Sequence, residues 1–194
     1  MVGKKEKKEE YLAKFSDAFA QNGLNRTPVK KLSEAAGINE ASIYQYFSNK
    51  DEIVIECVKQ YFADVQEELF PIMTNSLLQL DQRMQRVLLY HAQLEQREKF
   101  IVQVLTDPTY QKKCVPILRD FMVMIREMAS CLSSETEIPE NVLHPMVLMV
   151  MSMLIFHSIF NSTDSMLVQV DYIEELFSEE LKKARHSVPP PPEA

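Results

Sequence analysis

Polar side chains between residues 39 and 45 could form hydrogen bonds with the edges of DNA bases. Asn and Gln pair with adenine through two bonds, Glu accepts from cytosine, and Ser bonds either way. Ile38 precedes this run, and Ile43 lies within it. These two apolar side chains can hold a short helix against the protein while the other residues of the helix face outward. Such a division favours a helix that enters the major groove. The outward set is Asn39, Glu40, Ala41, Ser42, Tyr44 and Gln45.

The residues before this run fit the first half of a helix-turn-helix. Leu32 and Ala36 form the apolar side of a helix, and Ser33 is a small residue where two helices cross. Gly37 provides the turn, which needs a residue that tolerates positive φ. A helix-turn-helix with a purely structural role could show the same spacing, so this alternative stays open.

The charge distribution is consistent with a nucleic-acid surface near the N-terminus. The chain has 194 residues and a net charge of −7. Residues 1–50 hold nine Lys or Arg against six Asp or Glu, a net +3, while residues 51–194 hold twelve against 22, a net −10. An acidic protein can present a basic DNA-binding segment in this way, although an excess of +3 also fits ordinary scatter.

Patterns for catalysis, metal binding or cofactor binding are missing from the sequence. The four His show no HxxxH or HExxH spacing, and the three Cys show no CxxC. Only three Gly occur, which excludes a P-loop, a dinucleotide-binding loop and a nucleophile elbow. We therefore expect no catalytic residues, no metal and no cofactor, and the chain is not predicted to be an enzyme. A thiol redox role stays open, but Cys57 lies on an apolar stripe and is expected to be inert core.

Hydrophobic periodicity predicts an all-α chain of consecutive helices. Thr27 and Pro28 are expected at the N-cap and first position of the second helix, and Asn39 is expected to cap the third. The DNA-binding segment is placed at residues 1–50, an effector-binding and dimerisation segment at 51–188 and a disordered tail at 189–194. The expected helices span 5–22, 28–36, 39–47, 51–70, 73–88, 97–106, 109–132 with a split or kink at Pro116, 139–160 and 165–185.

The stretch TPVKKLSEAAGINEASIYQYFSNKDEI, residues 27–53, resembles the DNA-binding signature of the tetracycline-repressor (TetR) family of transcription regulators. The resemblance covers about residues 5–60. It implies an N-terminal three-helix DNA-binding domain followed by a larger helical domain that dimerises and binds a ligand. The matching positions are Thr27, Ala36-Gly37-Ile38, Tyr44, Phe47, Lys50 and Asp51.

The resemblance also implies roles for individual residues. The residues implied to contact DNA phosphates, or to support such contacts, are Thr27, Lys30, Tyr44 and Lys50. Those implied to face base edges or the adjacent DNA backbone are residues 39–42, with Gln45 and Tyr46. Tyr46 could instead be a packing residue. Two departures stand out, since Glu40 replaces a frequent Lys or Arg and Ala41 replaces a frequent Gly.

The segment MVLMVMSMLIFHSIF, residues 146–160, is too short to cross a membrane, which needs about 20 apolar residues. It is expected in the domain core or at a subunit interface. The resemblance implies that the two C-terminal helices form a homodimer interface. A reducing cytoplasm is the expected location, because the three Cys suggest no disulfide framework and the N-terminus has no apolar signal segment.

Methionine is abundant, and it suits either an adaptable apolar pocket or an ordinary core. The resemblance implies an effector pocket, so the chain is predicted to be a repressor that binds a palindromic operator as a dimer and is released by a small, apolar effector. The alternative is an all-helical protein–protein interaction module. Candidate effector residues are Tyr90, His91, Phe100, Met122, Arg126, Met149, Met153 and His157.

Overall fold

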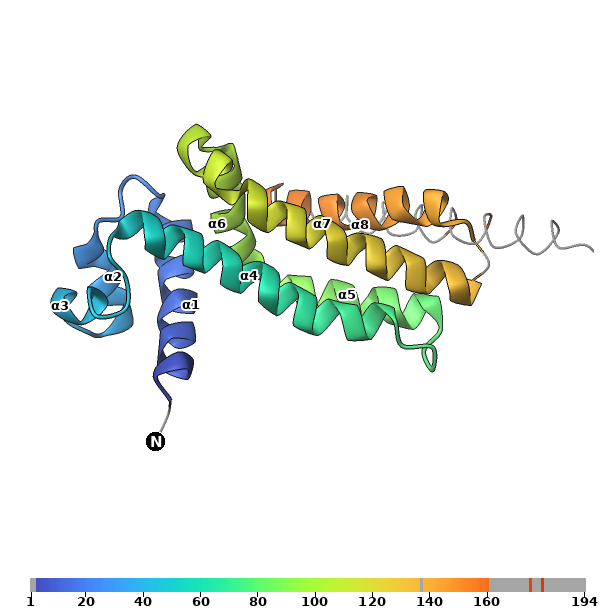
Figure 1. The fold of residues 1–194 in the computed structure, drawn as a ribbon, viewed down its shortest axis with the longest axis horizontal. Helices are drawn as coiled ribbons and strands as arrows, with labels where there is room; N and C mark the ends of the chain where they lie inside the picture. Colours follow the sequence, from blue (N-terminus) through green and yellow to red (C-terminus); the bar gives the residue numbers. More distant parts are fainter. Residues whose placement is uncertain (1–2, 137, 161–174, 176–178, 180–194) are drawn as a thin grey trace, which may run out of the picture. The chain divides into compact units, whose positions relative to one another are not determined.

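The computed structural model describes residues 3–136, 138–160, 175 and 179 of the chain. Helices account for its regular structure, and the described residues contain no strand, which confirms the all-α prediction. The helix expected at 165–185 and the tail at 189–194 lie outside the described residues, apart from Glu175 and Glu179. The helices are α1 (Lys4–Asn22), α2 (Val29–Ala36), α3 (Glu40–Ile43), α4 (Lys50–Met73), α5 (Leu80–Gln93), α6 (Glu95–Thr106), α7 (Pro108–Thr136) and α8 (Glu140–Phe160) (Figure 1).

The chain forms two compact units, and each has its own core. The N-terminal unit comprises Met1–Glu68 and Ala92–Phe121, and the C-terminal unit comprises Leu69–His91 and Met122–Ala194. α4 and α7 each contribute residues to both units. The N-terminal unit thus extends beyond the DNA-binding segment placed at residues 1–50. α6 and the first part of α4 contact α1, and the start of α7 contacts the first turn of α4.

Aromatic side chains on one face of α1 build the core of the N-terminal unit. Phe15 and Phe19 are fully buried, as their helical spacing predicts. The Phe15 ring meets Phe47 edge-on, with centroids 6.0 Å apart, and the Phe19 ring stacks on Phe100 at 5.6 Å. α1 therefore packs against α2 and α6, and Phe47 fixes the segment that follows α3.

Several helix ends differ from the sequence-based expectation. α2 begins at Val29 with Pro28 at the N-cap, because the hydroxyl of Thr27 donates to Gly23 O (2.8 Å) rather than capping the helix. α3 ends at Ile43 rather than Phe47, since three-residue bonds such as Tyr46 N–H to Ile43 O (2.9 Å) tighten the chain into a turn.

Prolines interrupt the helices less than expected. α4 continues past Pro71 to Met73, so the proline lies in its last turn. α7 runs without a break through Pro116, which is exposed, so water can satisfy the backbone carbonyl that the proline leaves without a donor.

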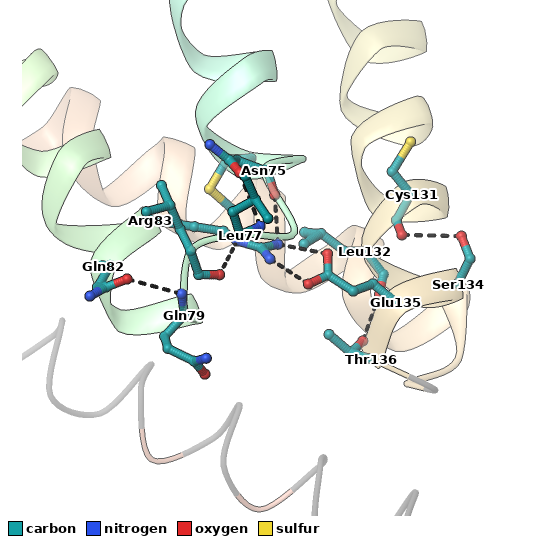
Figure 2. A network of polar contacts seen from close by, with 12 residues as sticks. Asn75, Leu77, Gln79, Gln82, Arg83, Cys131, Leu132, Ser134, Glu135 and Thr136 are labelled. Carbon is teal, nitrogen blue, oxygen red and sulfur yellow. Dashed lines mark hydrogen bonds and ion pairs between the residues drawn. The ribbon is translucent and has the colours of Figure 1, made fainter.

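The C-terminal unit has a methionine-containing core and a buried arginine. Met124, Met128 and Met146 are buried together with aliphatic residues of α7 and α8. Figure 2 shows the guanidinium of Arg83 on α5 facing the carboxylate of Glu135 on α7. Within the described residues, the helices are too short or too polar to pass through a lipid bilayer.

Candidate nucleic-acid interface

The turn between α2 and α3 has the geometry that a helix-turn-helix requires. Gly37 adopts φ 71° and ψ 32°, in the left-handed region, and its N–H donates to Glu34 O (3.2 Å). Ile38 N–H donates to Ser33 O (3.0 Å), so the chain reverses within two residues. Ser33 and Ala36 are buried at the crossing, where small side chains let the helices approach. The predicted turn at Gly37 is confirmed, and Ser33 is buried, as a small residue at a helix crossing should be.

Asn39 caps α3, as predicted. Its Oδ1 accepts from the Ser42 N–H (2.8 Å) and from the Ser42 hydroxyl (2.9 Å). This cap fixes the first turn of a helix of only four residues. Ile43, on the opposite side, is fully buried and anchors the helix to the core.

The Asn39 cap and the buried Ile43 leave the remaining side chains of α3 facing outward. The resulting polar surface consists of exposed side chains of α2, of α3 and of the residues next to them, and Tyr44 retains 53% of its accessible area. We call this set the recognition surface: Lys30, Asn39, Glu40, Ala41, Tyr44 and Gln45. Ser42 lies beside it, partly exposed and bonded to Asn39.

Besides Asn39 and Ser42, three more of the residues expected to contact DNA have intramolecular partners in this structure. Thr27 is fully buried, and its hydroxyl donates to Gly23 O. Tyr46 is partly buried, with its ring edge-on to Tyr11 at 5.6 Å between centroids. In this structure these side chains support the fold of the N-terminal unit, and their DNA contacts stay predictions.

Lys50 is the third. Its Nζ donates to Leu24 O at 2.5 Å and lies 5.8 Å from the centre of the Phe19 ring. Desolvation by burial lowers the pKa of the Lys50 ammonium, and the neighbouring Asp51 opposes this shift. The side chain thus links the first turn of α4 to the loop between α1 and α2.

The start of α4 has a reciprocal cap that the sequence analysis did not identify. Asn49 Oδ1 accepts from the Glu52 N–H (2.9 Å), while Glu52 Oε2 accepts from the Ser48 N–H (2.6 Å). Hydrogen bonding from the side chain and the backbone N–H of Ser48 lowers the pKa of the Glu52 carboxyl. The sequence does carry a signal for this cap, because the polar Asn49 is followed three residues later by Glu52.

The candidate effector residues are distributed over both compact units. Phe100 is fully buried in the N-terminal unit, where it stacks on Phe19. Tyr90 and His91 lie on α5, and Met122 and Arg126 are exposed on α7, all in the C-terminal unit. Met149 on α8 is 39% exposed. Met153 and His157 also lie on α8, but their side chains are outside the described residues. Their effector roles stay predictions.

Two open clefts lie in the N-terminal unit, and neither contains a candidate effector residue. One, of about 490 Å³, separates Gly23–Arg26 from Gln103–Pro108, and the other, of about 460 Å³, lies between α1 and α2. In the described part of the chain, no three His, Cys, Asp or Glu side chains are grouped so that they could hold a metal ion.

The sequence of the helix-turn-helix matches known regulators. Residues 16–57 match the family model of bacterial regulatory proteins, tetR family. The HTH-type transcriptional repressor KstR2 of Rhodococcus jostii (strain RHA1) is 33% identical over 63 residues, 32% of this chain and 31% of that protein. The fatty acid metabolism regulator protein of Bacillus subtilis (strain 168) is 31% identical over 68 residues, 34% and 35% of the two chains. The chain therefore matches about a third of the length of these relatives.

The fold resembles solved structures over a longer span. A protein of Mesorhizobium loti MAFF303099 assigned to the TetR family of transcriptional regulators has a TM-score of 0.71 and 17% identity, over 91% of this chain and 97% of that one. The Bacillus subtilis transcriptional regulator FadR, solved in complex with stearoyl-CoA, has a TM-score of 0.64 and 16% identity, over 87% and 96%. At these identities the likeness concerns the fold. Residues 16–57, which contain the helix-turn-helix, thus match the tetR family of bacterial regulatory proteins in sequence, and the chain as a whole is similar to a structure of that family in fold.

Proposed function

We propose that this protein is a transcriptional repressor that binds operator DNA through the recognition surface. The observation that carries the proposal is the exposed polar face of α3, which the Gly37 turn, the Asn39 cap and the buried Ile43 hold in one orientation. A rigid, exposed short helix after such a turn is suited to the major groove.

The side chains of this surface divide into two chemical classes. Lys30 can neutralise a phosphate, which adds affinity and fixes the position of the protein on the duplex. Gln45 can pair with adenine, and the Glu40 carboxylate can accept from cytosine. The Oδ1 of Asn39 caps α3, so its Nδ2 is the atom that can donate to a base. The operator is therefore expected to be read by α3, while α2 contributes to backbone contact.

We infer that the active form is a homodimer through α8 and the segment at 165–185, which the sequence predicts to be helical. A two-fold dimer would place two copies of α3 about 34 Å apart, one turn of DNA, or at a multiple of this distance. A palindromic operator would follow from that symmetry.

We further infer that a small apolar effector releases the DNA, and a long-chain acyl thioester is the first class to test. A relative is named for fatty acid metabolism, and the similar FadR structure contains stearoyl-CoA. The effector would favour a conformer with poor half-site spacing, and α4 would couple the two sites because it contributes residues to both units.

Selection from a random duplex library, followed by affinity measurements across a salt series, tests the DNA-binding proposal. Lys30→Ala should weaken binding to all sequences and reduce the salt slope by about 1, whereas Lys112→Ala, an exposed lysine on α7, should change neither. Gln45→Ala should relax specificity at one base pair at a cost of about 1–3 kcal/mol, with the exposed Gln85→Ala as its control. Absence of binding even at low salt would favour the interaction module.

Titration of the protein–operator complex with stearoyl-CoA tests the effector class. Release of DNA by stearoyl-CoA, but not by coenzyme A alone, would support an acyl-chain effector. If neither compound releases DNA or raises the melting temperature of the free protein, the proposed effector class is wrong, while the DNA-binding proposal stands.

A further inference from the structure

The turn between α6 and α7 is tightly fixed. Asp107 Oδ1 accepts from the N–H groups of Thr109 (2.8 Å) and Tyr110 (3.3 Å), so its side chain caps the start of α7. Pro108 occupies the first helical position, where its missing N–H has no cost. The direction of the Tyr110 side chain is therefore set by its own helix.

From this turn, two side chains reach the first turn of α4. The Tyr110 ring is buried, and its hydroxyl donates to Asp51 Oδ1 at 2.8 Å. Lys113 Nζ donates to Asp51 Oδ2 at 2.5 Å. Hydrogen bonds from Lys113 and Tyr110 hold the pKa of the Asp51 carboxyl below its usual range. Burial and the adjacent Asp51 raise the pKa of Tyr110, so its hydroxyl keeps its proton at neutral pH.

The first turn of α4 is also where the helix-turn-helix is held in place. Lys50, next to Asp51, bonds to Leu24 O, and Phe47, four residues before Asp51, is buried against Phe15. Only six residues separate the end of α3 from the start of α4. A displacement of the Asp51 turn would thus be passed directly to α3.

The end of α6 supports the same arrangement from the other side. Gln103 Nε2 donates to Ala20 O (3.1 Å) in the last turn of α1, and Phe100 stacks on Phe19. The segment from Phe100 to Lys113 therefore contacts both α1 and α4. Every one of these contacts lies within the N-terminal unit.

We propose that Asp51 and Tyr110 are positioning residues for DNA binding, which set the orientation of α3 by joining the first turn of α4 to the first turn of α7. The proposal rests on the proposed function. α7 is one continuous helix from Pro108 to Thr136 and contributes residues to both units, and its hydrogen bond from Tyr110 to Asp51 links it to the first turn of α4.

The test is a double-mutant cycle of Tyr110→Phe and Asp51→Ala, with operator affinity and unfolding by urea as its two readouts. Tyr110→Phe removes one hydrogen bond without leaving a cavity, and we expect operator affinity to fall about three- to tenfold. Asp51→Ala removes both acceptor oxygens, so it should cost at least as much, and the double variant no more than Asp51→Ala alone. The salt slope should stay unchanged, because no phosphate contact is lost.

Lys113 provides a matched comparison. Lys113→Met should weaken operator binding while Lys113→Arg should restore most of it, and Lys112→Met, an exposed neighbour on the same helix, should have no effect. Affinities are compared at a temperature where circular dichroism shows all variants to be folded, so that a loss of stability alone would not change them.

The two proposals fail in different ways. If the wild-type protein binds its operator and the Tyr110 and Asp51 variants bind equally well, the positioning role is wrong and the proposed function stands. If the wild-type protein binds no DNA, both are wrong, and coupling between Tyr110 and Asp51 in the urea cycle would then show a purely structural contact.

Discussion

Arg83 offers the sharpest test of how the C-terminal unit is held together. Its side chain is only 2% exposed, yet it donates to three groups from different segments. Nη1 donates to Met73 O (3.0 Å) at the end of α4 and to Glu135 Oε2 (2.8 Å), and Nε donates to Leu78 O (3.0 Å). A second bond from Nη2 to Glu135 Oε1 completes a bidentate pair (Figure 2).

Arg83→Met is expected to lower the free energy of unfolding by about 3 kcal/mol. The buried Met73 carbonyl would lose this donor, at a cost of about 1–2 kcal/mol. The bonds to Leu78 and Glu135 are partly buried, so water can replace them in part and they contribute about 1–2 kcal/mol together. Urea unfolding followed by circular dichroism, at one protein concentration, measures the difference.

Arg86→Met is the matched control, because Arg86 is exposed on the same helix and should cost less than about 0.5 kcal/mol. Glu135→Gln isolates the ion pair. In the wild-type protein, hydrogen bonds from Arg83 hold the pKa of the Glu135 carboxyl below its ordinary value of 4.5. The pair therefore stabilises the fold above pH 4.5, and its contribution disappears as the pH falls through the lower, folded-state pKa.

The reasoning would be refuted if Arg83→Met cost no more than Arg86→Met. It would also fail if the stability difference between the wild-type protein and Glu135→Gln stayed constant between neutral pH and acid. Either result would mean that water satisfies the carbonyls and the carboxylate as well as the guanidinium does.

Three further predictions concern single positions. Gly37→Ala should cost about 1–2 kcal/mol in urea unfolding, because left-handed backbone disfavours a Cβ even though the space around it is open, and an unchanged midpoint would contradict this turn geometry. Phe100→Ala should cost about 3–5 kcal/mol, because its ring is fully buried against Phe19, and a cost below 1 kcal/mol would contradict that burial. Burial raises the pKa of the Cys57 thiol to about 12, so alkylation of the folded protein, followed by mass spectrometry, should show the exposed Cys131 labelled before Cys57. Equal labelling of Cys57 and Cys131 would be inconsistent with the burial of Cys57.

The helix-turn-helix could be predicted because its determinants are local. The left-handed Gly37 and the Asn39 cap each depend on hydrogen bonds that span three to five residues. Such bonds are dictated by residue type and spacing, so the sequence alone carries them. The buried positions of α1 follow from the helical period for the same reason.

Helix ends were predicted less well, because neighbouring segments compete for the same groups. Thr27 is a good N-cap by type, but its hydroxyl bonds to the preceding loop, and α2 starts one residue later. The end of α3 is likewise decided by three-residue bonds and by the cap of α4 that follows, and not by its own residue preferences.

By itself, the sequence determined the all-α class, the helix-turn-helix and its outward polar face, because each follows from periodicity or from contacts a few residues apart. Only the tertiary structure decided which partners the remaining side chains meet. Tyr110 reaches Asp51 across 59 positions, and Arg83 reaches Glu135 across 52. Phe100, a candidate effector residue, packs on Phe19, 81 positions away in the sequence. These pairings depend on the path of the whole chain, and no spacing rule within one helix encodes them.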